Sequence, residues 1–183
     1  MTEDDRRRWD ERHGRYGLPP VPRLPEQFGA FADRFPRSGV ALELACGGGE
    51  TSVWLAQRGL HVTGVDVSPV AIGHARELAA AEGVESSCRF DVHDLDLGLP
   101  AGPPAAVVVC HLFRDARLDV PILDRLAPGG LLAIAVLSEV GAEPGPFRVT
   151  HGALPRAFAA LDVVAVGEGD GRAWLLGLKL SRR

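Results

Sequence analysis

The chain has 183 residues, enough for one domain with a full core, and its 46% hydrophobic and 24% charged residues are typical of a soluble globular protein. A net charge of −4 and a pI of about 5.9 argue against a nucleic-acid partner or an anionic membrane surface. No apolar run reaches the roughly 18 residues of a membrane span. Three cysteines in strand-like or glycine-rich settings and the polar start MTEDDRRRWD, which is unlike a secretory signal, predict a cytoplasmic protein with reduced thiols.

Helix-like and strand-like segments alternate along the chain. A proline-rich stretch at residues 19–22 separates an N-terminal arm, about residues 1–24, from the rest of a single domain that covers residues 1–183. Helices are expected at about residues 25–35, 50–57, 69–81, 119–126 and 154–160, and strands at about 40–45, 61–65, 88–92, 105–110, 131–137, 162–166 and 173–180. This alternation predicts an α/β fold with an open, mostly parallel seven-stranded sheet and helices on both faces.

An ionisable residue stands inside the first expected strand. Glu43 lies in the apolar run VALEL, residues 40–44, where a carboxylate is costly unless it is hydrogen-bonded. Three glycines, residues 47–49, follow the strand and add backbone freedom that folding must remove. Both features weaken the fold locally, and open α/β sheets bind ligands outside the carboxyl ends of their strands. The pattern therefore favours a ligand at this loop.

A second carboxylate, Asp66, ends the next strand. At that position it can accept hydrogen bonds from both hydroxyls of a ribose, or it can only cap the following helix, a position that Ser68 already fills. A nicotinamide dinucleotide site would share the glycines and this acidic residue. Such a site needs a further glycine three residues on, for a pyrophosphate at the helix N-terminus. Here the glycines are followed by Glu50, which would repel a pyrophosphate, so the loop favours a nucleoside without phosphates.

Four motifs in order resemble class I S-adenosylmethionine-dependent methyltransferases. They are ELACGGG at residues 43–49, GVDVSP at 64–69, RFDVHDL at 89–95 and LAPGGLL at 126–132, and the resemblance covers about residues 38–140. The resemblance implies a Rossmann-like, doubly wound sheet with an antiparallel last strand, and it is closest in kind to small single-domain enzymes of the tellurite-resistance type. Two positions depart from the family pattern: Ala45 replaces the first loop glycine, and alanines at 105 and 106 replace an acidic residue.

The resemblance also implies roles for single residues in binding S-adenosylmethionine, whose product is S-adenosylhomocysteine. Glu43 would bond the loop amides or, through water, the cofactor's ammonium group. Asp66 would bind the ribose. The other implied cofactor contacts are Ala45, Gly47 and Gly49 around the methionine part, Val67 on the adenine, Asp94 at the adenine amino group, Leu95 through its amide, and Cys110 at the methionine end, where a structural thiol is an equal alternative. For Asp94 the alternative is a solvated turn residue.

The chemistry would be an in-line methyl transfer, which needs alignment first and a general base only for some acceptors. His111 follows the fourth strand and is the candidate catalytic residue, either as a base or as a group that orients the acceptor. Arg114 either neutralises an anionic acceptor or pairs with Asp115. The remaining histidines show no ligand spacing, so we expect no metal.

Trp9, His13 and Tyr16 recur at helical spacing in the arm, which predicts a helix with these side chains on one face. As structure, this helix would pack on the domain. By the resemblance, it would be a lid over the cofactor, with Trp9, Tyr16 and Arg114 near the acceptor.

The chain has no room for a separate substrate domain. We therefore expect a small-molecule acceptor, which could be a thiol, a chalcogen oxyanion such as tellurite, or a phenol or amine metabolite. We expect neither a nucleic-acid nor a membrane partner, and the oligomeric state stays open. The alternative function is a protein that binds S-adenosylmethionine or S-adenosylhomocysteine without transfer activity, or that acts through a partner.

Overall fold

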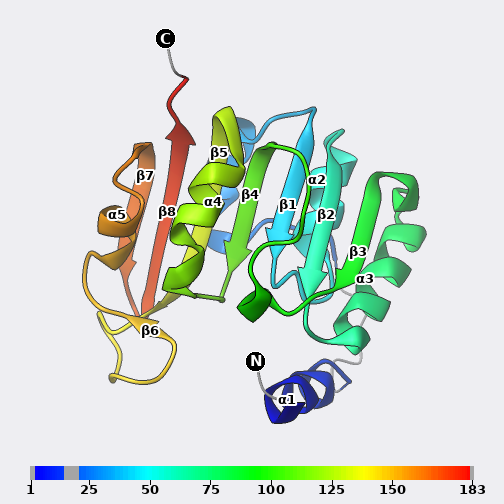
Figure 1. Ribbon diagram of the computed structural model, residues 1–183, viewed down its shortest axis with the longest axis horizontal. Coiled ribbons are helices and arrows are strands. Elements are labelled where there is room, and N and C mark those ends of the chain that lie inside the picture. The colour runs from blue at the N-terminus through cyan, green and yellow to red at the C-terminus, as the bar shows by residue number, and fades with distance from the viewer. Residues whose placement is uncertain (1–2, 15–20, 182–183) are drawn as a thin grey trace.

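One sheet forms the centre of the domain in the computed structural model, which describes residues 3–14 and 21–181, with side chains from residue 6 (Figure 1). Its order is β3-β2-β1-β4-β5-β8-β7, with β6 beside β5. Strands β1 to β6 pair in parallel, whereas β8 is antiparallel to both β5 and β7. The strands are β1 (Val40–Leu44), β2 (His61–Asp66), β3 (Cys88–Val92), β4 (Ala105–His111), β5 (Leu126–Ser138), β6 (Arg148–Val149), β7 (Leu161–Gly169) and β8 (Arg172–Lys179). The predicted mostly parallel sheet with an antiparallel last strand is confirmed.

Helices connect the strands, and their ends follow local sequence signals. Ser68 caps α3 by accepting a hydrogen bond from the Ala71 amide, and Pro69 occupies the first helical turn, where proline is favoured. The α-helices are α1 (Glu3–Gly14), α2 (Glu50–Gln57), α3 (Pro69–Ala81), α4 (Asp119–Arg125) and α5 (Ala153–Ala157). The 3₁₀ helices are η1 (Glu26–Arg34), η2 (Glu85–Ser87), η3 (Leu95–Leu97) and η4 (Ala116–Leu118).

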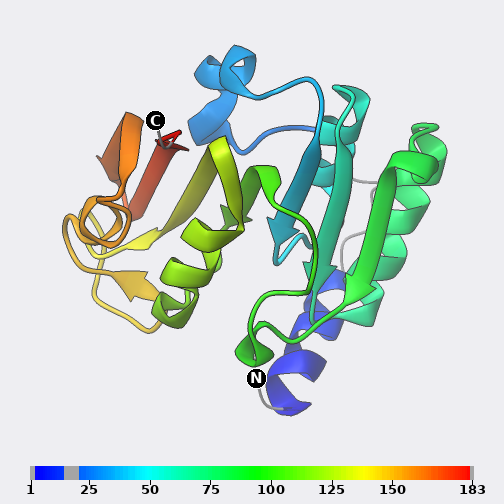
Figure 2. The same cartoon turned by 45° about the horizontal axis from the view of Figure 1, so that its top comes forward.

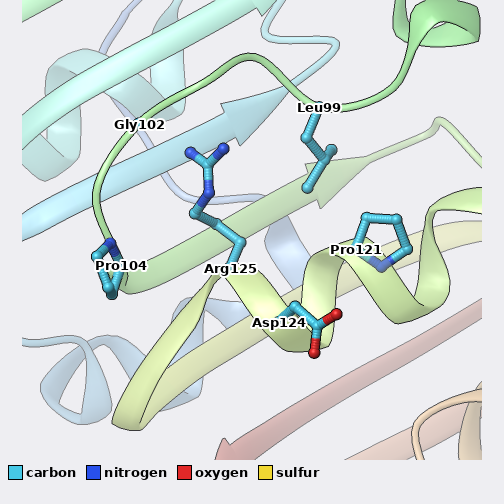
Figure 3. Close-up of a pocket in the computed structure, with 6 residues that line it drawn as sticks. All are labelled: Leu99, Gly102, Pro104, Pro121, Asp124 and Arg125. Carbon is cyan, nitrogen blue, oxygen red and sulfur yellow. The ribbon is translucent and has the colours of Figure 1, made fainter.

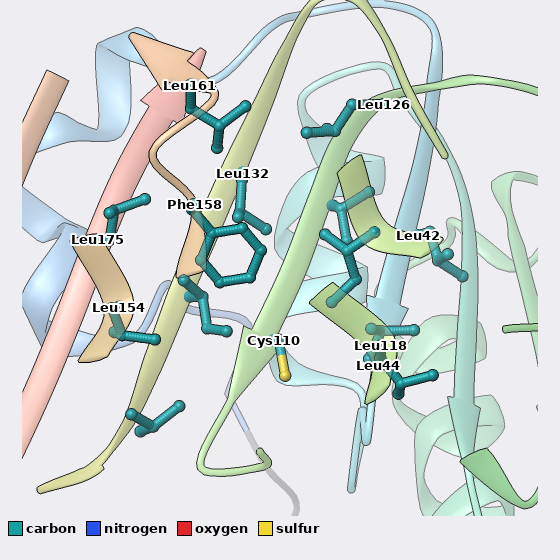
Figure 4. Packing of buried hydrophobic residues seen from close by; sticks show 14 of the residues in the cluster. Leu42, Leu44, Cys110, Leu118, Leu126, Leu132, Leu154, Phe158, Leu161 and Leu175 are labelled. Atoms are coloured by element: carbon teal, nitrogen blue, oxygen red, sulfur yellow. The ribbon is translucent and has the colours of Figure 1, made fainter. Parts of the chain in front are cut away.

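Both faces of the sheet are covered by helices, as predicted. On one face, α4 and α5 pack on the sheet through a cluster that includes Leu132, Phe158 and Leu175, all fully or almost fully buried (Figures 1 and 4). On the other face, η1 and α2 cover β1, β4 and β5, with Phe28 set edge-on against Trp174 of β8. A third cluster joins α2, α3 and β3 around Phe90 on this second face.

Three elements differ from their predictions. Strand β5 begins at Leu126 rather than near residue 131, because Leu126 pairs with Ala105 and the pairing resumes, after a bulge, between Leu131 and Val107. The segment at residues 25–35 is the 3₁₀ helix η1 and not an α-helix. The two-residue strand β6 adds an eighth strand that no sequence pattern indicated, since it is held only by its pairing with the end of β5.

The parallel strands place several loops at one edge of the sheet. Because β1 to β5 run in the same direction, their carboxyl ends lie together, and the loops after β1, β2, β3 and β4 meet there. Helix α1 lies beside this edge in both views (Figures 1 and 2) and contacts α3. The fold thus brings the first three motifs and α1 to the same end of the molecule, whereas the fourth motif, at residues 126–132, begins beside the amino end of β4.

We expect Phe158→Ala to lower the free energy of unfolding by about 3–5 kcal/mol, since it leaves a cavity between α5 and the sheet. Urea denaturation followed by circular dichroism measures this change. Leu180→Ala is the control, because this side chain is 64% exposed and its loss is expected to cost no more than about 0.5 kcal/mol. Equal effects of the two substitutions would contradict the assignment of the core.

Candidate functional site

The loop after β1 is a tight turn in a conformation that side chains rarely adopt. Ala45, Gly47 and Gly49 all have positive φ values, of 52°, 52° and 80°. A Cβ at Gly49 would lie 2.7 Å from the Cβ of Ala75, so glycine is required where the loop meets α3. Ala45 holds the left-handed conformation without being glycine, which is a strained choice of the kind found at functional sites. The substitution of the family glycine by Ala45 therefore preserves the backbone turn.

Asp66 connects the glycine loop to the tip of β2. Its Oδ2 accepts a hydrogen bond from the Gly47 amide at 2.9 Å, and its Oδ1 accepts one from the Ser68 amide at 2.9 Å. The residue is 7% exposed. An ionised carboxylate has about four lone-pair sites, and the described residues fill two of them. Asp66 is thus a preorganised acceptor at the adjoining ends of two strands.

Glu43 lies beneath the first turn of α2. The Ser52 hydroxyl donates to its Oε2 at 2.5 Å. Burial raises the pKa of Glu43 to about 7, and hydrogen bonds from Ser52 and Thr51 oppose this rise. The resemblance implied bonds to the loop amides or, through water, to the cofactor's ammonium group. The bonds found here go to Ser52 and Thr51 of α2, directly after the loop. They explain how a carboxyl group is accommodated in an apolar strand.

The end of β3 completes a row of three strand tips. The His93 amide bonds the Asp66 carbonyl, which places the turn after β3 next to Asp66. Asp94 caps η3 by accepting from the Asp96 amide at 2.9 Å, and the Leu95 side chain is buried in the core beneath. Val67, at the end of β2, is half-buried. These residues lie beside the Asp66 carboxylate, and the capping bond of Asp94 fits the alternative that it is a turn residue.

Helix α1 contacts the same loop and strand tip. The Ser68 hydroxyl donates to Asp10 Oδ1 at 2.5 Å. The His13 ring lies over Gly47, with its Cε1 3.5 Å from where a Cβ of that residue would stand, and burial lowers the pKa of His13 although Asp66 opposes this. Trp9 is 39% exposed and stacks near His13, with 6.2 Å between ring centroids. Tyr16, the third predicted arm residue, lies outside the described residues.

The segment after β4 holds the predicted catalytic histidine. His111 is half-buried, and burial lowers its pKa to about 4, assisted by the positive charges of Arg172 and Arg23. The imidazole is therefore neutral at neutral pH. The next residue, Leu112, is 44% exposed and has a positive φ of 59°. An apolar side chain thus faces solvent beside His111, at the edge where the loops meet.

Cys110 and Arg114 both turn toward the α4 face of the sheet. The Cys110 thiol is buried among core side chains and donates to the Phe113 carbonyl at 3.2 Å, and burial raises its pKa to about 12, which favours the structural role. The predicted pairing of Arg114 with Asp115 is wrong. Arg114 pairs in bidentate fashion with Asp119, at 2.5 and 2.7 Å, because the start of α4 offers that carboxylate, whereas Asp115 bonds Arg117.

A separate pocket of about 380 Å³ lies at the opposite edge of the sheet (Figure 3). It is formed between the loop before β4 and helix α4, where the Arg125 side chain bonds the Pro100 carbonyl. Its lining residues are Leu99, Gly102, Pro104, Pro121, Asp124 and Arg125. Since these residues flank the amino end of β4, the pocket is remote from the glycine loop.

Sequence reasoning missed several partners of the motif residues. Glu43 bonds Ser52, and Asp66 bonds the Gly47 amide. In both cases the partner comes from another segment of the chain. Ser52 had a detectable signal, since it stands in the first turn of the helix that follows the glycines. Asp10 had none, because a surface carboxylate in a charged helix gives no indication of its distant partner Ser68.

The described part of the chain contains neither a membrane-spanning helix nor a group of metal ligands. No helix among residues 3–14 and 21–181 combines the length and apolar character needed to cross a bilayer. Within the same ranges, no three histidine, cysteine or acidic side chains are grouped so that they could hold a metal ion.

Comparisons with known proteins agree with the geometry. Residues 41–130 match the family described as "Methyltransferase domain". The ubiquinone biosynthesis O-methyltransferase of Xylella fastidiosa is 31% identical over 120 residues, which are 62% of this chain and 48% of that protein. The ajmaline N-methyltransferase of Rauvolfia serpentina is 33% identical over 110 residues, 57% of this chain and 38% of that protein. The chain thus spans about half or less of the length of these relatives.

Among solved structures, TehB from Haemophilus influenzae superposes with a TM-score of 0.75 at 17% identity, over 85% of this chain and 62% of that one. This likeness concerns the fold, whose strand order and reversed β8 are described above. The family match covers the glycine loop, Asp66, Asp94 and the turn at residues 128–130, which are the positions that carry the motifs. The chain belongs to the class I S-adenosylmethionine-dependent methyltransferases.

Proposed function

We propose that the protein transfers a methyl group from S-adenosylmethionine to a small-molecule acceptor. The observation that carries this proposal is the joint arrangement of the glycine loop and Asp66, linked by the Gly47 amide at the ends of β1 and β2. The described residues leave two acceptor sites of Asp66 unfilled, which equals the number of ribose hydroxyls. The bound cofactor supplies an electrophilic methyl group on a sulfonium. The residues around it bind, orient and exclude water.

In this proposal, each motif residue in the row of strand tips has a binding role. Asp66 accepts hydrogen bonds from the ribose hydroxyls, and Val67 packs on the adenine. Asp94 and the Leu95 amide form hydrogen bonds with the edge of the adenine. Around the methionine part, Ala45, Gly47 and Gly49 bring the backbone close. Glu43 reaches the ammonium group through water, which favours its ionised form and compensates for the burial of its charge.

His111 contacts the acceptor in this proposal. A general base works best when its pKa lies near the working pH, and the pKa of His111 is about 4. The neutral imidazole is therefore better suited to orienting an acceptor by a hydrogen bond than to removing its proton. Alignment of the acceptor with the methyl group then supplies much of the rate.

Helix α1 acts as a lid in this proposal. His13 lies against Gly47, where the methionine part of the cofactor would approach the backbone, so the helix shifts to admit the cofactor and then closes over it. The hydrogen bond from the Ser68 hydroxyl to Asp10 holds α1 in the closed position beside Asp66. Closure excludes water from the transfer step.

The first test of the function is cofactor binding and turnover. By calorimetry, S-adenosylhomocysteine should bind at micromolar concentrations and NAD should not, because Glu50 stands at the start of α2. Asp66→Ala should weaken binding by roughly 1.5–3 kcal/mol, as expected for hydrogen bonds to a charged group. Tighter binding of NAD, or unchanged binding by a folded Asp66→Ala variant, would contradict the proposal.

Formation of S-adenosylhomocysteine with a panel of thiols, oxyanions, phenols and amines distinguishes a transferase from a protein that only binds the cofactor.

The Glu43 carboxyl group should make stability depend on pH. Its pKa is raised on folding, so the folded state holds the proton more tightly and stability falls as the pH rises from about 5 to 8. Glu43→Gln keeps the bond from Ser52 and removes the ionisation. The free energy of unfolding from urea titrations at pH 5 and pH 8 should therefore fall by about 2–3 kcal/mol more in the wild type than in the variant. Parallel profiles would show that Glu43 is not buried as described.

The lid contact can be tested through Asp10. We expect Asp10→Ala to weaken binding of S-adenosylhomocysteine by about 0.5–1.5 kcal/mol, since one hydrogen bond that holds the closed helix is lost. Calorimetry measures the change, and Glu11→Ala on the same helix, an exposed residue, is the control. Tighter binding by the Asp10 variant would mean that α1 obstructs the site rather than closing it.

A further inference from the structure

His111 lies within the electrostatic reach of two guanidinium groups. The charges of Arg172 and Arg23 both act to lower the pKa of the imidazole. The three residues come from separate places in the fold: the end of β4, the start of β8 and the segment before η1. Two positive charges around a neutral histidine, at the edge of the sheet that carries the binding motifs, create a positive local potential.

The strand register places His111 and Arg172 on the same face of the sheet. His111 pairs with Ala135 of β5, and Ala135 pairs with Trp174 of β8, two residues from Arg172. Side chains two apart on a strand share a face, and Trp174 packs on η1. Val109, two residues before His111, belongs to the same cluster as Ala135. On this face β5 contributes the small side chain of Ala135 beside His111 and the side chain of Leu137 beside Arg172.

The Arg172 guanidinium carries an unused donor. Its Nη1 is buried and has no hydrogen-bond partner among residues 3–14 and 21–181. Where β7 pairs with β8, Glu168 is the acidic residue nearest to Arg172. Its carboxylate already accepts hydrogen bonds from Ser138 Oγ and the Gly152 amide and pairs with His151. A buried cationic donor without a partner is costly, and an acceptor atom supplied by a ligand would satisfy it.

Arg23 connects this cluster to the glycine loop. Its amide bonds the Glu50 carbonyl and its guanidinium bonds Glu50 Oε1, both at 3.2 Å, so it sits on the first residue of α2. The side chain is 73% exposed, which leaves further donors of its guanidinium group available. Arg23 therefore links this cluster to the first residue of α2, where the Glu50 carboxylate balances part of its charge.

We propose that Arg172, His111 and Arg23 form a subsite for an anionic group of the methyl acceptor, a carboxylate or a comparable oxyanion. The inference rests on the proposed function and narrows its acceptor to an anionic small molecule. Arg172 offers a planar pair of donors that matches a carboxylate, and the neutral His111 ring donates one further hydrogen bond. The cofactor's own carboxylate has the same chemistry, so the test must separate the two sources.

The probe is benzoate, with benzamide as its neutral analogue, titrated into the 183-residue chain saturated with S-adenosylhomocysteine and followed by NMR. We expect benzoate to bind at least about tenfold more tightly than benzamide. Arg172→Gln should weaken benzoate binding by about tenfold or more and leave the affinity for S-adenosylhomocysteine within about twofold. Arg37→Gln is the matched control, because this exposed arginine, near Asp33, precedes the amino end of β1.

Two results would overturn the subsite. Equal binding of benzoate and benzamide, or benzoate binding that Arg172→Gln leaves intact, would show that no anion site exists there. If Arg172→Gln instead weakens S-adenosylhomocysteine about tenfold but does not affect 5′-methylthioadenosine, which lacks the amino-acid part, then Arg172 holds the cofactor carboxylate and the acceptor assignment is wrong. Failure of the wild type to bind S-adenosylhomocysteine would refute the proposed function, a separate outcome that is measured before the probe is added.

Discussion

The hydrogen bond from the Gly47 amide to Asp66 joins the ends of β1 and β2, and the rest of the site depends on it. The parallel sheet brings the two strand ends together, and this bond and the one from Ser68 fix where the carboxylate points. The loop can reach Asp66 only because its residues adopt positive φ angles. The glycines after β1 are thus explained by a backbone path that presents amides to a neighbouring strand, and the same path brings the backbone close to a ligand.

The site concentrates groups that cost stability. Glu43 is a carboxyl group in an apolar strand, His111 is a neutral imidazole near two cations, and Arg172 has a buried donor without a partner among the described residues. Elsewhere the sheet is covered by well-packed aliphatic and aromatic clusters. This division is expected where a stable core supports a binding site whose groups are satisfied only when ligands are present.

The sequence predicted what local chemistry determines. The alternation of strands and helices, the Ser68 cap of α3 and the position of Asp66 at a strand tip all followed from short patterns. Features that depend on distant pairing could not be predicted. Strand β6 exists only through its pairing with β5. Arg114 pairs with Asp119, one helical turn beyond the expected Asp115. Arg172 lies on the same face of the sheet as His111 through the register of three strands. The contact of Asp10 with Ser68 is likewise a product of tertiary packing.

The central claim is that S-adenosylmethionine binds over the loop that joins β1 to α2, with Asp66 at its centre. Titration of the ¹⁵N-labelled protein with S-adenosylhomocysteine tests it most directly, because the Gly47 and Ser68 amides both bond Asp66. These two resonances should be among the most strongly shifted, and they should saturate together at micromolar ligand. The claim would be contradicted if they stay unchanged while Leu99 and Gly102, in the pocket at the opposite edge of the sheet, shift instead.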